Sequence, residues 1–373
     1  MASDSKENNN HLVKTPSEEE EEDYDGACAL LLGCNPIFSA VLKAALELHL
    51  FEIIANEASS YGAPMSVSEI ASHLPTQHPE MPRRLERMLH LLASHSLLAC
   101  SSRTNQDGGL ERVYGLTPVA QYFAHDISAE LFRSLSKFLS HQAITEVLIN
   151  FKDAILDSEA DLFKKIHGKT AYEYMATDPT LNEAFQAVMT KFCLIDTLGV
   201  LEVYNGFEGI STLVDVGGGS GQNLQMIIAE YPSIKGINFD LPQVIKNAPK
   251  LSGIEHVGGD MFTSVPSGDA MMLKAITHNW SDETCVTILR NCNKALTEKG
   301  KVIIVDVIMP ETIEPTVKAQ LTCRLDNMMF LYAGGRERTE KEFEALCKQS
   351  GFSGFQVVCR AHSALGVIEF HKG

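Results

Sequence analysis

Three consecutive glycines directly follow an apolar run near the middle of the chain. The stretch reads LVDVGGGSGQ, residues 213–222, and a fourth glycine follows the serine. An apolar, β-branched run that ends in glycines predicts a strand and a tight turn, because glycine adopts left-handed backbone conformations without strain. The next segment, GQNLQMIIAEYP, has a single apolar face at helical spacing. A strand, a bare turn and a helix in this order are typical of the ligand-binding turn of an α/β sheet.

The segments after this turn continue to alternate between strands and helices. Strands are expected at 234–240, 253–260, 269–276 and 301–309, and two more, FQVVCRA and ALGVIEFHK, close the chain. Helices are expected at 282–296, with Gly300 placed to end it, and at 340–350, ended by Gly351. This alternation predicts a doubly wound, mostly parallel α/β sheet. The two closing strands predict one antiparallel partner at its edge.

The N-terminal third of the chain has a different pattern. Helical spacing of apolar residues covers 35–55 and 82–94, and cap signals precede Glu69 in SVSEIASHL. A polar, glycine-rich turn, TNQDGG, then leads to a short β-like stretch at 112–116. Helices followed by a small hairpin suggest a winged-helix-like module. A DNA-binding role is the literal interpretation, but no basic recognition face is visible, which favours packing or dimerisation.

The charge balance and the cysteine pattern limit the possible partners and compartment. The sequence has 48 acidic and 31 basic residues, a formal net charge of −17, so we expect no nucleic acid and no membrane partner. Nine scattered cysteines without a C-x-x-C pair, and no histidine pair at metal-ligand spacing, predict reduced thiols and no metal site. Without a signal-peptide pattern or an apolar run long enough to cross a bilayer, the protein is expected to be cytoplasmic.

The glycine turn itself limits the class of ligand that can bind there. Gly217, Gly219 and Gly221 form G-x-G-x-G, whereas the dinucleotide fingerprint needs a glycine at the position occupied by Gln222. The stretch also lacks the G-K-[ST] of a Walker-type phosphate loop. A bare turn without these features favours a nucleoside ligand that has no pyrophosphate, and it disfavours a nicotinamide dehydrogenase.

Side chains at the ends of the next strands strengthen this interpretation. Asp240 ends the second strand, where a carboxylate can accept both ribose hydroxyls. Asp260 and Met261 follow the third strand and would suit an adenine amino group and ring face. Lys274 and His278 lie at the end of the fourth strand, on the same expected rim.

Taken together, these motifs resemble the plant caffeic-acid-type O-methyltransferases, which use S-adenosylmethionine. The resemblance is carried by LVDVGGGSG, YPSIKGINFDLP, GIEHVGGDMF, LKAITHNWSDE and GGRERTEKEFE, and it extends over nearly all of the chain past residue 25. It implies a seven-stranded, Rossmann-like methyltransferase sheet with an N-terminal helical dimerisation domain, and a homodimer. We therefore expect an acidic disordered tail at 1–25, a dimerisation domain at 26–125, linking helices of the substrate pocket at 126–210 and a cofactor-binding domain at 211–373.

The resemblance also implies roles for individual residues. The family's general base falls on His278, and its two flanking acids fall on Asp306 and Glu337. Two positions that clamp an aromatic substrate in the family fall on Phe185 and Met189, which periodicity alone would assign to a helix core. The family's cofactor positions fall on Gly217, Asp240, Leu241, Asp260, Met261 and Lys274.

Four departures from the family pattern stand near these positions. Asp306 replaces the usual glutamate, Asn279 replaces an aspartate after the base, Ala275 replaces a tryptophan, and Cys193 replaces a serine near the cofactor. The leading hypothesis is an S-adenosylmethionine-dependent O-methyltransferase that acts on the phenolic hydroxyl of a small plant-type aromatic metabolite. Two alternatives stay open: an N-methyltransferase of an aromatic amine or alkaloid, which needs less help from a base, and a non-catalytic homologue that binds the cofactor.

Overall fold

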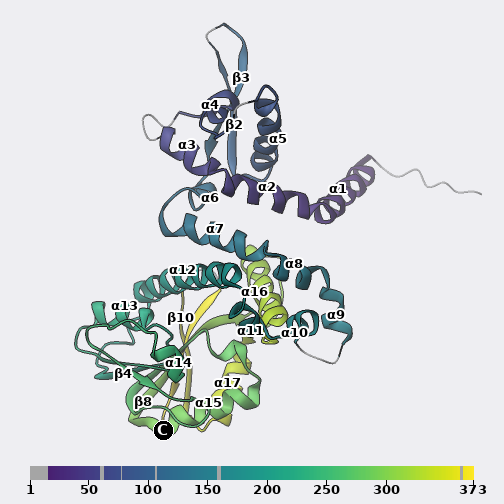
Figure 1. Ribbon diagram of the computed structural model, residues 1–373. Helices are drawn as coiled ribbons and strands as arrows, with labels where there is room; N and C mark the ends of the chain where they lie inside the picture. The colour runs from purple at the N-terminus through teal and green to yellow at the C-terminus, as the bar shows by residue number, and fades with distance from the viewer. Residues whose placement is uncertain (1–15, 59–62, 77, 106, 158–160, 362–363) are drawn as a thin grey trace, which may run out of the picture. The chain divides into compact units, whose positions relative to one another are not determined.

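The computed structural model describes residues 16–58, 63–76, 78–105, 107–157, 161–361 and 364–373 (Figure 1). The chain divides into two compact units, residues 1–133 and 134–373, with the boundary inside helix α7 (Asp126–Leu139). The expected boundary between the first domain and the linking helices, at 125/126, therefore lies a few residues before the observed one.

The N-terminal unit packs helices against a small antiparallel sheet. The sheet has the order β1-β3-β2, as expected for the wing of a winged-helix-like module. Its apolar core includes Phe51, Leu89 and Tyr114, all fully buried. The unit contains α1 (Pro16–Gly33), α2 (Asn35–Glu47), α3 (Leu50–Ala58), β1 (Met65–Ser66), α4 (Val67–Ser72), α5 (Met81–Ser94), β2 (Leu98–Thr104), β3 (Leu110–Leu116) and α6 (Pro118–Gln121).

Local sequence signals set several of these boundaries. Ser66 and Glu69 form the expected capping box at the start of α4. The helix expected over 35–55 is interrupted between α2 and α3, where His49 has a φ of +54°. Apolar spacing continues through this break, so periodicity alone does not reveal it. Of the expected tail, residues 1–15 lie outside the described residues, while residues 16–25 belong to helix α1.

A series of helices leads from α7 to the large sheet. They are α8 (Gln142–Ile149), α9 (Phe151–Leu156), α10 (Leu162–His167), α11 (Ala171–Met175) and α12 (Pro179–Val203). Asp178 caps α12, whose first turn contains Pro179. Contrary to expectation, α12 is long and apolar enough to cross a membrane, and the bent pair Asp23–Gly33 and Asn35–Glu47 also passes this test. Length and composition do not distinguish such a helix from a core helix of a globular domain, and α12 is bonded to the sheet domain as described below.

The C-terminal unit is built on the expected, mostly parallel sheet. Its strands follow the order β10-β11-β8-β7-β4-β5-β6, and a two-residue strand, β9, pairs with β8. Strands β4 to β8 run parallel, whereas β11 pairs antiparallel with both β8 and β10. The antiparallel strand is thus second from the edge. The strands are β4 (Thr212–Val216), β5 (Lys235–Asp240), β6 (Ile254–Gly258), β7 (Gly268–Lys274), β8 (Leu296–Met309), β9 (Arg338–Thr339), β10 (Gly354–Arg360) and β11 (Leu365–His371).

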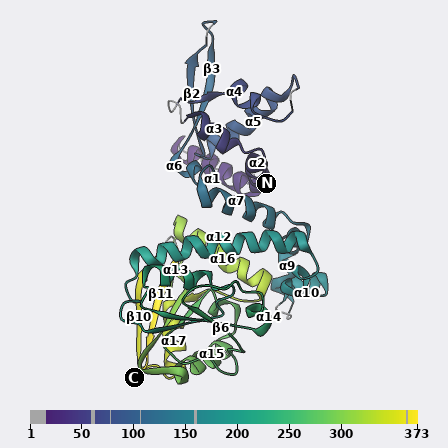
Figure 2. The same ribbon diagram turned by 60° about the vertical axis from the view of Figure 1, so that its left-hand side comes forward.

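Helices cover both faces of this sheet (Figures 1 and 2). One face packs on α15 (Asp282–Ala295) and α17 (Glu340–Gln349) through Leu289 and Phe343. The other packs on α12 and α13 (Gln222–Glu230) through Val200 and Leu224. The remaining elements are α14 (Pro242–Ile245), the 3₁₀ turn η1 (Thr277–Asn279) and α16 (Val317–Ala333). This two-sided burial explains why the parallel strands read as nearly continuous apolar runs.

Two glycines expected to end helices behave differently. Gly351 has a φ of +82° and follows α17 as expected. Gly300 does not end α15, which stops at Ala295, and it lies inside β8 instead. A β-carbon at Gly300 would lie 2.9 Å from the carbonyl oxygen of Asp269. Close approach to strand β7, not helix termination, is what requires glycine there.

Candidate active site

The glycine turn connects β4 to α13 at the carboxyl edge of the sheet. Gly217, Gly219 and Gly221 have φ values of +78°, +59° and +84°, which other residues adopt only with strain. Gly218 is required for a different reason: a β-carbon there would lie 2.2 Å from Asn238 Oδ1. A β-carbon at Gly219 would instead meet nothing within 4 Å, so the turn faces open space on that side. The turn therefore offers a bare backbone surface that a cofactor can approach.

Asp240, at the end of β5, is held against this turn by backbone amides. The amide of Gly219 donates to Asp240 Oδ2 (2.9 Å), and the amide of Leu241 donates to Oδ1 (2.7 Å). Each carboxylate oxygen retains a lone pair for a further donor, such as a ribose hydroxyl. The Leu241 side chain next to it is exposed. The structure thus brings Gly217, Asp240 and Leu241 together at one edge of the sheet.

Asp260 and Met261 follow β6, at the same edge. One carboxylate oxygen of Asp260 accepts the amide of Phe262 (2.9 Å) and so shapes the local turn. The carbonyl oxygen of Met261 accepts a hydrogen bond from Asn291 Nδ2 (2.9 Å). The Met261 side chain packs against the hydrophobic core of the sheet domain. Asp260 therefore has a turn-forming role, while its second oxygen is available to another donor.

His278 lies in η1 and is paired with a buried carboxylate. Its Nδ1 is 3.0 Å from Glu337 Oε1, and the Glu337 side chain is only 2% exposed. Burial opposes protonation of the imidazole, but the bond to Glu337 and the charges of Asp306 and Glu337 outweigh it and raise the pKa of His278. Burial also disfavours the charged form of Glu337 and raises its pKa, although His278 acts in the opposite direction. An Nδ1–H directed at Glu337 leaves Nε2 as the proton acceptor.

The segment that carries Glu337 also holds the backbone around His278. The amide of Arg336 donates to the carbonyl oxygen of His278 (2.9 Å). The buried Arg338 guanidinium donates to the carbonyl oxygens of Thr277 (2.6 Å) and Trp280 (2.7 Å). A β-carbon at Gly335 would lie 2.1 Å from the His278 carbonyl oxygen, so only glycine fits there. The sequence alone did not reveal this role of Arg338, whose partners lie about 60 residues earlier in the chain.

Asp306 lies on β8 and is buried, but it does not bond to His278. The hydroxyl of Thr277 donates to Asp306 Oδ2, and Oδ1 has no hydrogen-bond partner among the described residues. Asp306 acts on the imidazole through its charge. Of the two acids expected to flank the base, Glu337 contacts it directly, and Asp306 holds the neighbouring residue of the same turn.

One of the departures from the family pattern, Asn279, has a local explanation. Ala275 adopts a φ of +56° immediately after β7. The side-chain amide of Asn279 donates to the carbonyl oxygen of Ala275 (3.1 Å) and closes this short turn. An ionised aspartate has no donor and could not make that bond. Asn279 therefore fits the turn that presents His278.

Lys274 ends β7 and is nearly sealed from solvent. Its Nζ is 3.0 Å from Asp196 Oδ2, with 5% of the lysine side chain exposed. Burial opposes the charge, but Asp196, together with Cys193 and Asp215, outweighs burial and raises the pKa of Lys274. Asp196 lies on α12, and sequence reasoning did not single it out as a partner of Lys274. A single carboxylate in the apolar run FCLIDTLGV was the available signal.

Phe185 and Met189 lie one turn apart on α12 and are partly buried. The ring of Phe185 is 5.9 Å from that of Phe138 and 6.0 Å from that of Tyr172, between centroids. Phe138 in turn meets Tyr332 edge-on at 5.8 Å. These rings form an aromatic cluster between α7, α11, α12 and α16, which accounts for Phe185 by packing and provides an apolar surface beside it.

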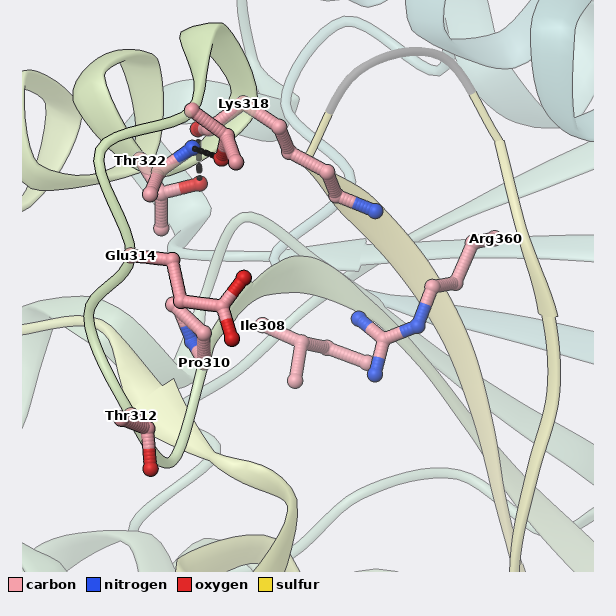
Figure 3. Close-up of a pocket in the computed structure, with 9 residues that line it drawn as sticks. Ile308, Pro310, Thr312, Glu314, Lys318, Thr322 and Arg360 are labelled. Carbon is pink, nitrogen blue, oxygen red and sulfur yellow. Dashed lines mark hydrogen bonds between the residues drawn. The ribbon is translucent and has the colours of Figure 1, made fainter.

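A cavity of about 220 Å³ lies elsewhere, between the loop after β8, the start of α16 and the end of β10 (Figure 3). It is lined by Ile308, Pro310, Thr312, Glu314, Thr316, Lys318, Ala319, Thr322 and Arg360. None of the residues expected to bind cofactor or acceptor lines it. In the described part of the chain, no group of three or more His, Cys, Asp or Glu side chains could hold a metal ion.

Family models match both units of the chain. An O-methyltransferase domain matches residues 149–353, and an O-methyltransferase dimerisation domain matches residues 32–126. The match to the dimerisation domain agrees with the helical and hairpin pattern expected for the first third of the sequence.

Individual proteins are similar over nearly the whole length. The caffeic acid 3-O-methyltransferase of Catharanthus roseus is 45% identical over 367 residues, covering 98% of both chains. O-methyltransferase 13 of Lophophora williamsii is 46% identical, covering 97% of this chain and 99% of its own. Among solved structures, CalO1, a methyltransferase of calicheamicin biosynthesis, superposes with a TM-score of 0.76 at 23% identity, over 96% of this chain and all of its own, which supports the fold.

Proposed function

Because the chain belongs to the S-adenosylmethionine-dependent O-methyltransferases of the plant caffeic-acid type, we propose that it methylates a phenolic hydroxyl with His278 as the general base. The observation that carries the proposal is the His278–Glu337 pair at 3.0 Å, on the rim that also holds the glycine turn. The acceptor is a small aromatic metabolite, for which the aromatic cluster around Phe185 provides an apolar surface.

The chemistry requires a proton to leave the phenol as its oxygen attacks. A free phenol has a pKa near 10 and histidine one near 6.5, so full proton transfer before attack is uphill by roughly 5 kcal/mol. The raised pKa of His278 reduces this gap. His278 Nε2 therefore takes the proton while the oxygen–methyl bond forms and the bond between that methyl group and sulfur breaks, and Glu337 stabilises the imidazolium that results.

The cofactor supplies an electrophilic methyl group on a sulfonium, and the chain supplies the groups that hold it. Gly217 would present its backbone to the cofactor, Asp240 would accept hydrogen bonds from the ribose hydroxyls, and Asp260 would accept one from the adenine amino group. Leu241 and Met261 would contact the adenine ring, and Lys274 lies at the end of β7 on the same edge. The open space beside Gly219 and the free lone pairs of Asp240 support this assignment.

We further propose a cytoplasmic homodimer. The match to a dimerisation domain supports the homodimer, as do Leu30, Leu31 and Leu32 at the end of α1 and Ile37 in α2, whose side chains are exposed.

The acceptor class is tested by methyl transfer from labelled S-adenosylmethionine to pairs of matched acceptors. Each pair consists of a phenol and the aniline with the same ring substituents, and the products are identified by mass spectrometry. We expect O-methylated products and turnover of the phenol at least about tenfold above that of its aniline. Labelled amine as the main product would replace this proposal with N-methylation.

A further inference from the structure

The buried ion pair between Lys274 and Asp196 lies at the carboxyl edge of the sheet. In the register of β4 and β7, Asp215 is opposite Met272, so Lys274 is level with Gly217, the first glycine of the turn. The partners are 78 residues apart in sequence and come from β7 and α12. The Lys274–Asp196 ion pair therefore lies level with the start of the glycine turn.

A second bond fixes the same turn of α12 to this edge. The Thr197 hydroxyl donates to Asn223 Oδ1 (2.9 Å), in the first turn of α13, directly after the glycine turn. Adjacent residues of α12 thus bond to the end of β7 and to the start of α13. The position of the Asp196 carboxylate is therefore set by β7 and α13, both of which lie next to the glycine turn.

Asp196 also lies on the helix face that carries the expected acceptor residues. Phe185, Met189, Cys193 and Asp196 follow one another at spacings of four, four and three residues, which places them on one stripe of α12. At 1.5 Å per residue, the stripe extends about 16 Å from the aromatic cluster to the Lys274 end. It passes from the expected acceptor side to the cofactor side of the site.

The charges in this region must accommodate a cation. S-adenosylmethionine carries an ammonium, a carboxylate and a sulfonium, a net charge of +1, whereas its product, S-adenosylhomocysteine, has lost the sulfonium charge and is neutral. An uncompensated lysine beside the turn would repel the donor more than the product. In the described part of the chain, Asp196 is the group that forms an ion pair with Lys274. Its side chain is 26% exposed, so the carboxylate is not sealed away from the site.

We propose that Asp196 is a charge-balancing residue of the cofactor site, which neutralises Lys274 and so maintains affinity for the cationic donor over the neutral product. The inference rests on S-adenosylmethionine as the cofactor. It is independent of the acceptor and of His278, because it concerns binding and not methyl transfer.

The test is the ratio of two dissociation constants, Kd for S-adenosylmethionine divided by Kd for S-adenosylhomocysteine, measured by isothermal titration calorimetry. Asp196→Asn removes the ion-pair partner of Lys274, and we expect the ratio to rise about tenfold, equal to about 1.4 kcal/mol. Lys274→Met leaves the carboxylate alone, and the ratio should fall by a similar factor. The double variant Asp196→Asn/Lys274→Met, which lacks both charges, should return to within about twofold of wild type.

Two controls separate charge from structure. Glu255→Gln breaks an exposed ion pair with Lys235 (2.9 Å) at the far end of the same sheet and should leave the ratio unchanged. Asp196→Glu keeps the charge and should keep the ratio. If Asp196→Asn weakens both ligands equally, or if both single variants move the ratio in the same direction, the proposal is overturned. If Asp196→Asn fails to fold, Lys274→Met and the double variant still show in which direction each charge changes the ratio of the two dissociation constants.

Discussion

His278 Nδ1 and Glu337 Oε1 are 3.0 Å apart, although the two residues are separated by 59 positions in the chain. The contact depends on a segment that wraps around the histidine turn. Arg336 and Arg338 bond to its carbonyl oxygens, and the amide of Glu337 donates to Asp326 Oδ1 (2.8 Å). The orientation of the proposed base is therefore set by the loop between α16 and α17.

Replacing Glu337 by glutamine should lower both the rate and the pKa of the base. The Glu337 carboxylate raises the pKa of His278, so removing the carboxylate should lower that pKa. The imidazole acts as a base only in its neutral form. We expect the ascending limb of kcat/KM against pH to move to lower pH, with kcat reduced about 10- to 100-fold. Glu344→Gln, which breaks an exposed pair with Lys348, is the control. An unchanged inflection would show that Glu337 does not tune the imidazole.

Gly218→Ala should weaken cofactor binding. The added methyl group would lie 2.2 Å from Asn238 Oδ1 and 2.7 Å from the Asp215 carboxyl group, so the turn must shift. We expect Kd for S-adenosylhomocysteine to rise at least about tenfold. Gly26→Ala, in helix α1 with nothing within 4 Å of the new β-carbon, should bind normally. Normal binding by both variants would contradict the described turn.

Asp215→Asn should change how stability depends on pH. Burial raises the pKa of Asp215 to about 7. The folded state therefore holds this proton more tightly than the unfolded state, and the resulting stability is fully present below about pH 4 and is lost as pH rises through 7. Asparagine removes this dependence, so the variant should gain in Tm relative to wild type between pH 5 and pH 8. A constant difference across that range would exclude a raised pKa.

Two tyrosines with buried hydroxyl groups should respond in opposite directions to loss of the hydroxyl. The Tyr332 hydroxyl is buried and has no partner among the described residues, so Tyr332→Phe should raise the free energy of unfolding by about 1 kcal/mol. The Tyr204 hydroxyl donates to Glu369, so Tyr204→Phe should lower it by about 1–3 kcal/mol. Urea unfolding of both variants measures the difference. Equal destabilisation would show that Tyr332 has a partner in the unliganded protein.

The strands and most helices could be predicted because their signals are local. The apolar run before Gly217 and the β-branched run of β8 each indicate a strand without reference to the rest of the chain. The break at His49 could not, because apolar spacing continues through it. Tertiary packing decides where such patterns stop.

The site could be predicted in part for a similar reason. Asp240 is the last residue of β5, and His278 lies four residues after the end of β7, so the topology of a parallel sheet places them at one edge. The partners of His278 and Lys274 come from distant segments, and no local pattern connects Asp196 to Lys274. That Thr277, and not His278, bonds to Asp306 also depends on side-chain geometry. The sequence therefore indicates which residues lie at this edge, whereas their hydrogen-bond and ion-pair partners are known only from the structure.

The most direct test of the central claim is the rate of labelled methyl transfer to the best phenolic acceptor by wild type and His278→Ala, with cofactor affinity measured on the same preparations. His125→Ala, which changes an exposed histidine, is the control. If His278 is the base, kcat falls about 10²-fold or more in His278→Ala, Kd for S-adenosylhomocysteine changes less than about twofold, and the control behaves as wild type. Phenol methylation at the wild-type rate by His278→Ala would contradict the account.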